Sequence, residues 1–123
     1  MKKENTCAVI GNNHSSYSVM EIVVSVLDFI VNKGITNFLF HSGGGFVRDV
    51  FAVVCDLKKV YPNSSVVMVF SGDDTNSYTK RLLNGIYDSV IFAGVEGWQS
   101  QCDVTSMLHD KMKSLSSEIF QSP

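Results

Sequence analysis

Short apolar runs alternate with longer amphipathic stretches along this chain. The runs lack the regular polar alternation of a half-exposed strand, and polar loops or glycines end them, so they are typical of strands buried on both faces of a sheet. The predicted strands span residues 6–10, 36–41, 65–70 and 89–93.

Helical spacing fills the intervals between these runs. Ser18 followed by Glu21 matches a capping box, and Gly34 supplies a residue suited to the left-handed conformation at a helix end. Pro62 cannot continue a helix, so the second helix should stop before it. The predicted helices span about 18–33, 45–61, 76–84 and 104–120.

This alternation predicts an α/β fold of Rossmann-like, three-layer α/β/α type, with a mainly parallel sheet of about four to five strands joined by right-handed crossovers. The length of 123 residues suits one core, so we expect a single domain over residues 1–123. Ligands of such sheets bind beyond the carboxyl ends of the strands, where strand order reverses. Polar loops gather at that edge, at residues 11–16, 41–45, 71–75 and 94–97.

Composition and charge narrow the function. The net charge of −2 comes with no basic stripe, which argues against a nucleic-acid partner. The most apolar stretch, residues 19–31, is too short and too polar to cross a bilayer, and no signal peptide precedes it, so we expect a cytoplasmic protein with no membrane partner. Cys7, Cys55 and Cys102 form no metal or redox motif, which indicates reduced thiols, and we expect the first two to be small core residues.

A glycine turn follows the second predicted strand. Gly43, Gly44 and Gly45 would leave backbone N–H groups uncovered at a helix start, where the helix dipole favours a phosphate. The same glycines would also serve a tight turn with positive φ and no ligand. Because the turn lies at the ligand edge of the sheet, we favour a binding role.

Four motifs occur in order between residues 6 and 93: Cys-Ala-Val-Ile-Gly at 7–11, Gly-Gly-Gly-Phe-Val-Arg-Asp at 43–49, Leu-Lys-Lys-Val-Tyr-Pro at 57–62 and Tyr-Asp-Ser-Val-Ile at 87–91. Together they resemble the YpsA-like group of the SLOG superfamily, Rossmann-like proteins that include the Lonely Guy enzymes and the DNA-processing protein DprA. The resemblance implies a site for a nucleotide or a nucleotide-derived phosphorylated ligand at the glycine turn.

Some positions depart from that family pattern. Asn12 and Asn13 replace a histidine and an arginine, and Val47 stands where a later glycine of the turn is expected. The family also continues into a further strand after its last helix, whereas here the predicted last helix runs nearly to the end of the chain. We therefore expect a shortened, diverged member with a remodelled pocket.

Polar residues beside the turn complete the predicted site. The resemblance places Asp49 in the cleft, although a helix-dipole role is the alternative, and Arg48 could clamp a phosphate. Adjacent helix positions differ by about 100°, so the two should not face the ligand equally. The predicted ligand-binding residues are Gly11, Asn12, Asn13, His41, Ser42, Gly43, Gly44, Gly45, Arg48, Asp49, Ser71 and Gly72.

Other chemistry is less well supported. His14, His41, Asp73 and Asp74 lie in loops at one edge, but their spacing matches no zinc site, so we predict no metal and no cofactor, and assign His41 a hydrogen bond to the ligand. Ser42 has neither a nucleophile elbow nor a third member of a triad. No catalytic residue is predicted.

Three functions remain open. The first is a binding or sensor domain for a small nucleotide-like ligand. The second is a nucleoside-monophosphate phosphoribohydrolase like the Lonely Guy proteins, which the resemblance disfavours because Val50 stands where their motif has a glutamate. The third is a homodimeric interaction domain with a decayed site, suggested by apolar residues around most of the first predicted helix.

Overall fold

One five-stranded parallel sheet forms the centre of the molecule, as the sequence predicts. The computed structural model describes residues 1–11, 17–42, 44–71, 85–94 and 101–122. Its strand order is β4-β3-β2-β1-β5, and every neighbouring pair is parallel. The strands are β1 (Thr6–Ile10), β2 (Asn37–Phe40), β3 (Ser65–Phe70), β4 (Ser89–Phe92) and β5 (Glu118–Gln121), and the described helices are α1 (Val19–Val31), α2 (Gly45–Leu57), α4 (Gln101–Ser114) and the short 3₁₀ turn Lys3–Asn5.

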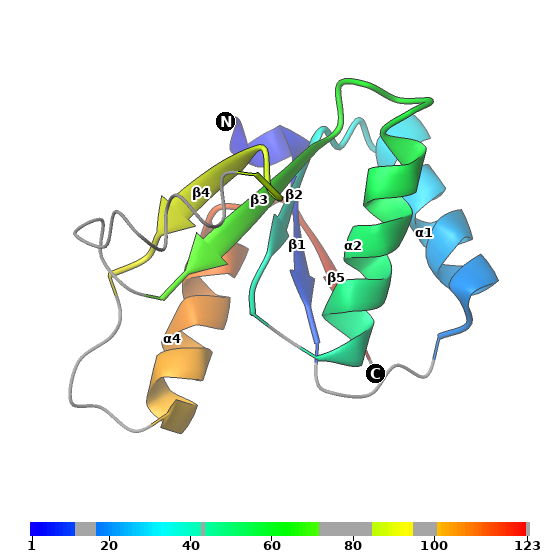
Figure 1. The fold of residues 1–123 in the computed structure, drawn as a ribbon. Helices are drawn as coiled ribbons and strands as arrows, with labels where there is room; N and C mark the ends of the chain where they lie inside the picture. The colour runs from blue at the N-terminus through cyan, green and yellow to red at the C-terminus, as the bar shows by residue number, and fades with distance from the viewer. Residues whose placement is uncertain (12–16, 43, 72–84, 95–100, 123) are drawn as a thin grey trace.

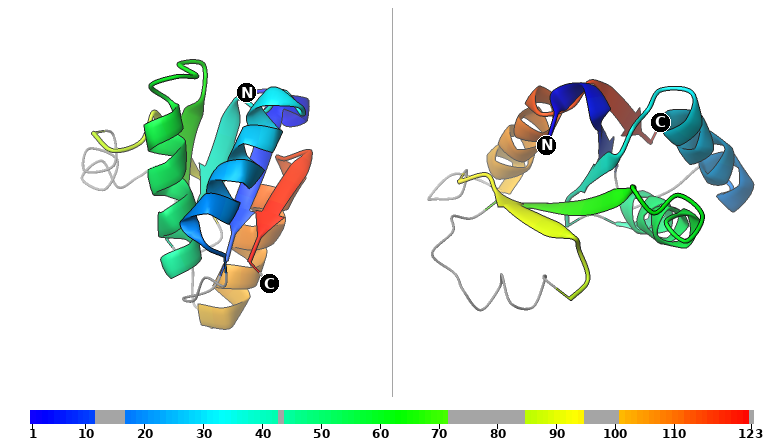
Figure 2. Two further views of the ribbon diagram at one scale, coloured as in Figure 1. Left: turned by 90° about the vertical axis from the view of Figure 1, so that its right-hand side faces the viewer. Right: turned by 90° about the horizontal axis from the view of Figure 1, so that it is seen from above.

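Helices cover both faces of the sheet. Helices α1 and α2 lie on one face and α4 on the other (Figures 1 and 2). The first four strands advance in one direction from β1, and β5 then returns to the far side of β1. A right-handed crossover made in the reverse direction must pass over the opposite face, which explains the position of α4. The strand order therefore reverses at β1.

Alternate strand residues build two separate cores. Phe38 and Phe40 are fully buried under α1 and α2, whereas Leu39 between them belongs to the cluster beneath α4. Both faces of the central strands are thus apolar, which is the reason for the continuous apolar runs in the sequence.

The end of the chain corrects one prediction. The last helix does not continue to Phe120, because α4 ends at Ser114 and the Ser116 hydroxyl donates to the Met112 carbonyl at 2.9 Å. Strand β5 follows and pairs with β1, so the further strand expected to be missing is supplied by the chain itself. Phe120, 6% exposed, anchors it in the core. The error arose because a four-residue strand with one buried side chain carries almost no periodicity of its own.

The other boundaries agree with the predictions to within a few residues. The Ser18–Glu21 capping box is present in both directions, and Gly34 has φ of 67°. Helix α2 ends at Leu57, earlier than the predicted 61, and turns lead from there to Pro62. The predicted helix at 76–84 lies outside the described residues. Within the described ranges, no helix is both long and apolar enough to cross a membrane.

Candidate functional site

The described part of the predicted site lies at the carboxyl edge of the sheet. Gly11 follows β1, His41 and Ser42 follow β2, and Ser71 follows β3 as a half-buried residue. Four predicted ligand residues lie outside the described residues, namely Asn12, Asn13, Gly43 and Gly72. The three loop residues that were considered as metal ligands together with His41 also lie outside them, namely His14, Asp73 and Asp74.

Helix α2 begins at this edge without a side-chain cap. Its N-cap is Gly44, with φ of −88° and ψ of −146°, and a glycine has no side chain that could accept a hydrogen bond from the first turn. Positive φ occurs, among the described glycines, at Gly34 and Gly94 rather than at Gly44 or Gly45. The need for a left-handed residue therefore does not explain these two glycines. Glycines at these two positions add no side chain of their own over the N–H groups of the helix start.

A pocket of about 260 Å³ opens beside this helix start. Arg48, in the first turn of α2, is exposed and lines it together with Ser42 and His41. Asp49 is also exposed but is not among the described residues of the lining. Five apolar side chains complete the described wall, and the rings of two of them, Phe51 and Tyr87, are 5.0 Å apart. The five are Phe40, Val47, Phe51, Met68 and Tyr87. Of the two adjacent charged residues, the structure brings the arginine to this pocket.

His41 is buried, with 6% of its surface exposed, and its ring links two loops. The Gly11 backbone N–H donates to its Nε2 at 3.4 Å, which requires that nitrogen to be unprotonated. Burial and the nearby His109 lower the pKa of His41 to about 4, against the opposing effect of its hydrogen bond to the Ser42 backbone. The imidazole is therefore neutral at physiological pH. It connects Ser42, after β2, with Gly11, after β1, and its nitrogens already have partners without any ligand.

His109 is a residue that the sequence reasoning missed. It lies on α4, and its ring centroid is 4.8 Å from that of His41. Its Nε2 is buried and has no hydrogen-bond partner in the part of the chain that the structure describes. Burial lowers its pKa, and Lys113 lowers it further while Asp110 opposes the change. Only the return of α4 across the far face of the sheet brings the two histidines together, so no local motif could have revealed the pair.

Gly11 is explained by packing. A Cβ atom at this position would lie 2.4 Å from Cδ1 of Phe46, the second residue of α2. Phe46 is fully buried and stacks edge-on against Phe120 at 5.1 Å. The start of α2 can therefore sit directly above β1 only because residue 11 has no side chain.

Two positions that the suggested resemblance compares with the Lonely Guy enzymes are apolar. Val50, at the position of the glutamate in that motif, is fully buried in the core between α2 and the sheet, and Val47 is 3% exposed. Burial raises the pKa of the Cys7 thiol to about 12, so this thiol is not a nucleophile at neutral pH. No group of three or more metal-binding side chains occurs among the described residues.

The first helix buries one face and exposes another. Ile22, Val26 and Phe29 are buried, as expected for a helix packed on a sheet. Four further apolar residues are 60–69% exposed, namely Val19, Met20, Val24 and Val31. The homodimer expected from the apolar character of this helix stays a prediction.

Comparison with protein-family models finds none that matches this chain, and comparison with curated proteins finds no significant match. The geometry of the carboxyl edge is therefore the basis for assigning a function.

Proposed function

We propose that this protein binds a small phosphorylated ligand of nucleotide type at the carboxyl edge of its sheet, without catalysing a reaction on it. The observation that carries the proposal is the uncapped start of α2 at Gly44, with the Arg48 side chain lining the adjacent pocket. Backbone N–H groups, the positive end of a helix dipole and a guanidinium are the three features that recur where proteins hold phosphate.

The apolar part of the pocket lining suits the uncharged part of such a ligand. The half-buried Phe51 and Tyr87 rings present aromatic surface, and the fully buried Phe40 packs edge to face against Phe51 at 5.3 Å and supports it from behind. A base or a sugar can pack against these rings while the phosphate faces Arg48. The volume of about 260 Å³ is below the range of roughly 300–1,000 Å³ usual for drug-sized ligands, which favours a mononucleotide or a smaller phosphorylated compound over a dinucleotide.

The same residues support binding without catalysis. His41 connects two loops and stays neutral at physiological pH, because its pKa is about 4. Val50 lies in the core and carries no acid or base. The Arg48 guanidinium can bind a phosphate but does not exchange a proton with it at neutral pH. The motif resemblance to YpsA-like proteins points to the same class of ligand. We include in the proposal a diverged relationship to that group.

The proposal is tested by thermal shift and calorimetry with AMP, ADP-ribose, NAD and cyclic AMP, with adenosine as the matched ligand that lacks a phosphate. At a ligand concentration of about one hundred times Kd, binding stabilises the fold by about 2.7 kcal/mol, which a melting curve resolves. We expect a shift with one or more phosphorylated compounds and none with adenosine.

The Arg48→Gln variant identifies the site. It should weaken binding about tenfold or more, since a charge-assisted hydrogen bond contributes about 1.5–3 kcal/mol. Lys111→Gln, which removes one positive charge from an exposed position on α4, is the control and should leave the affinity unchanged. The proposal fails if no phosphorylated compound shifts the melting curve, or if the two variants bind equally well.

A further inference from the structure

An apolar stripe runs along the side of α1 that faces away from the sheet. Its members recur at intervals of four, three and four residues, so at 3.6 residues per turn they lie within about 60° of one another around the helix axis. The buried residues of α1 point to the opposite side, toward the sheet. The α1 stripe consists of Met20, Val24, Leu27 and Val31.

The α1 stripe is accessible to a partner. Met20, Val24 and Val31 are mostly exposed, and Leu27 is half-buried, so much of this apolar surface is in contact with water. Alternating intervals of four and three residues are those at which one helix packs along another. The spacing therefore fits a helix better than it fits a strand or a small molecule.

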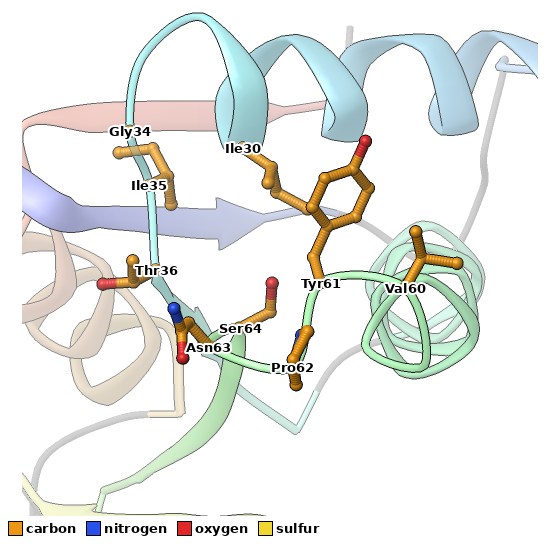
Figure 3. Close-up of a pocket in the computed structure, with 9 residues that line it drawn as sticks. All are labelled: Ile30, Gly34, Ile35, Thr36, Val60, Tyr61, Pro62, Asn63 and Ser64. Atoms are coloured by element: carbon orange, nitrogen blue, oxygen red, sulfur yellow. The ribbon is translucent and has the colours of Figure 1, made fainter.

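The apolar surface continues toward the end of α2. Figure 3 shows the Tyr61 ring beside Ile30 of α1, at the pocket between the ends of the two helices. Val60, in the turn after α2, lines the same pocket and is 69% exposed. Ile30 thus marks the flank of α1 that faces α2.

Acidic residues border the α1 stripe on both sides. Glu21 and Asp28 are seven residues apart on α1 and exposed, on the flank opposite to Ile30. Asp49 and Asp56, also seven residues apart, are exposed on α2. Because four acids lie beside one apolar stripe, the charge of the missing partner is specified as well as its shape.

The two aspartates of α2 lie on its flank toward α1. Helix α2 stands between α1 and β3 (Figure 1), and Val47, Arg48 and Phe51 on its far flank line the phosphate pocket. Helical spacing places Asp49 and Asp56 away from those three residues. Asp49, which the sequence analysis assigned to the ligand, therefore belongs to a different surface.

The cations of α1, α2 and their ends do not neutralise this border. Lys33 and Lys58 form ion pairs with Glu118 and Asp88, and Arg48 lines the phosphate pocket. Lys59 lies 3.9 Å from Asp56, but these two side chains are 80% and 81% exposed, so water and salt screen the pair.

A second copy of the chain fits the border poorly. In an antiparallel pair of α1 helices packed through the stripe, Glu21 of one copy would lie near Asp28 of the other, so like charges would meet. A membrane surface fits no better, because helices that lie on membranes carry lysine and arginine beside the apolar face, whereas α1 carries acids. A partner helix with its own cations satisfies both the apolar stripe and the acids.

We propose that the outer face of α1 is a docking surface for an amphipathic helix of a partner protein, in which lysine or arginine flanks an apolar stripe. The partner's apolar side chains pack between those of the α1 stripe, and its cations face the four acids. The stripe extends over about three turns, so a partner helix of about 12–14 residues spans it. This surface shares no residue with the lining of the phosphate pocket.

Two synthetic peptides of about 14 residues test the partner class. Both carry leucine at intervals of four and three residues, and they differ in having lysine or glutamate at the flanking positions. In isothermal titration calorimetry the lysine peptide should bind with one-to-one stoichiometry and at least about tenfold more tightly than the glutamate peptide. The proposal is overturned if neither peptide binds, or if both bind equally well.

The Val24→Gln variant locates the surface. It removes an apolar contact at the centre of the stripe and should weaken the lysine peptide about fivefold or more. Val24 is 60% exposed, so the variant should fold, which circular dichroism checks. The control is Ile86→Gln, at a residue outside the two helices that is 58% exposed, and it should leave the affinity unchanged. Equal affinities of the two variants would refute the assignment.

A double variant, Glu21→Gln with Asp28→Asn, tests the acidic border. Glutamine can accept the hydrogen bond of the Ser18 N–H as glutamate does, so the start of α1 is kept. The preference for the lysine peptide over the glutamate peptide should fall about fivefold. Glu4→Gln with Asp110→Asn removes the same charge from two exposed positions elsewhere and should not change the preference. An equal preference in the two double variants contradicts the role of the border.

Sedimentation velocity tests the competing occupant, a second copy. A wild-type dimer that Val24→Gln converts into a monomer would assign the stripe to a second copy and overturn the proposal. A wild-type monomer, or a dimer that Val24→Gln leaves intact, supports it together with peptide binding. None of these measurements depends on a ligand in the phosphate pocket, so this proposal and the proposed function can fail separately.

Discussion

The burial of His41 predicts a specific dependence of stability on pH. The ring has a pKa of 6.5 when exposed and about 4 in the folded protein. Above pH 6.5 it is neutral in both states. Between pH 6.5 and 4, His41 binds a proton in the unfolded chain but not in the folded protein, so the free energy of unfolding falls as the pH falls. Below pH 4 both states bind the proton and the loss is complete.

The magnitude follows from the difference between the two pKa values. At about 1.4 kcal/mol per pKa unit, the shift from 6.5 to about 4 corresponds to at most about 3.5 kcal/mol, of which about 3 kcal/mol is lost by pH 4. Two structural features oppose protonation besides burial. The Gly11 N–H needs the lone pair of Nε2, and His109 lies 4.8 Å away between ring centroids.

Urea denaturation followed by circular dichroism at pH 7.5, 6.5, 5.5 and 4.5 measures the effect, with His41→Asn as the variant. The variant should be less stable at pH 7.5, because its shorter side chain cannot reproduce both contacts of the ring. The difference in free energy of unfolding should then shrink by up to about 3 kcal/mol toward pH 4. The pKa values of His109 and Asp88 are also lowered, so these two groups likewise make the fold less stable as the pH falls. Both residues are present in the wild-type protein and in the His41→Asn variant. A difference that stays constant across this pH range would refute the reasoning.

Two further predictions concern packing. Gly11→Ala should destabilise the fold by about 1–3 kcal/mol in urea denaturation, because its Cβ would lie 2.4 Å from the Phe46 ring. The control Gly85→Ala, whose Cβ meets nothing within 4 Å, should be nearly neutral, and equal effects of the two variants would contradict the close approach. Phe120→Ala should lower the free energy of unfolding by about 3–5 kcal/mol in the same measurement, because this buried ring anchors β5 in the core. Ile119→Ala, at a half-exposed position, should lower it much less, and a small effect of Phe120→Ala would argue against β5 as part of the core.

Most of the fold was predictable because its signals are local. The strand at residues 65–70 and the capping box at Ser18 were predicted at their observed positions, since a fully buried strand and a capped helix start each leave a pattern within a few residues. Strand β5 was not predicted. It contains one buried side chain, and its other contribution to the sheet is backbone pairing with β1, which no property of residues 118–121 reveals.

The candidate site also combines features that the sequence predicts with features that depend on the tertiary structure. By itself, the sequence determined the alternation of elements, the edge at which the loops meet, and a helix start of glycines with an arginine in its first turn. The tertiary structure decided that Arg48 lines a pocket, that Gly11 is required by Phe46, and that His41 is a neutral ring beside His109. The physical reason is how far apart along the chain the interacting residues lie. Capping, turns and periodic burial act between residues close in the chain, whereas pKa values, cavities and close backbone approach depend on segments that meet only when the crossovers bring α2 and α4 against the same sheet.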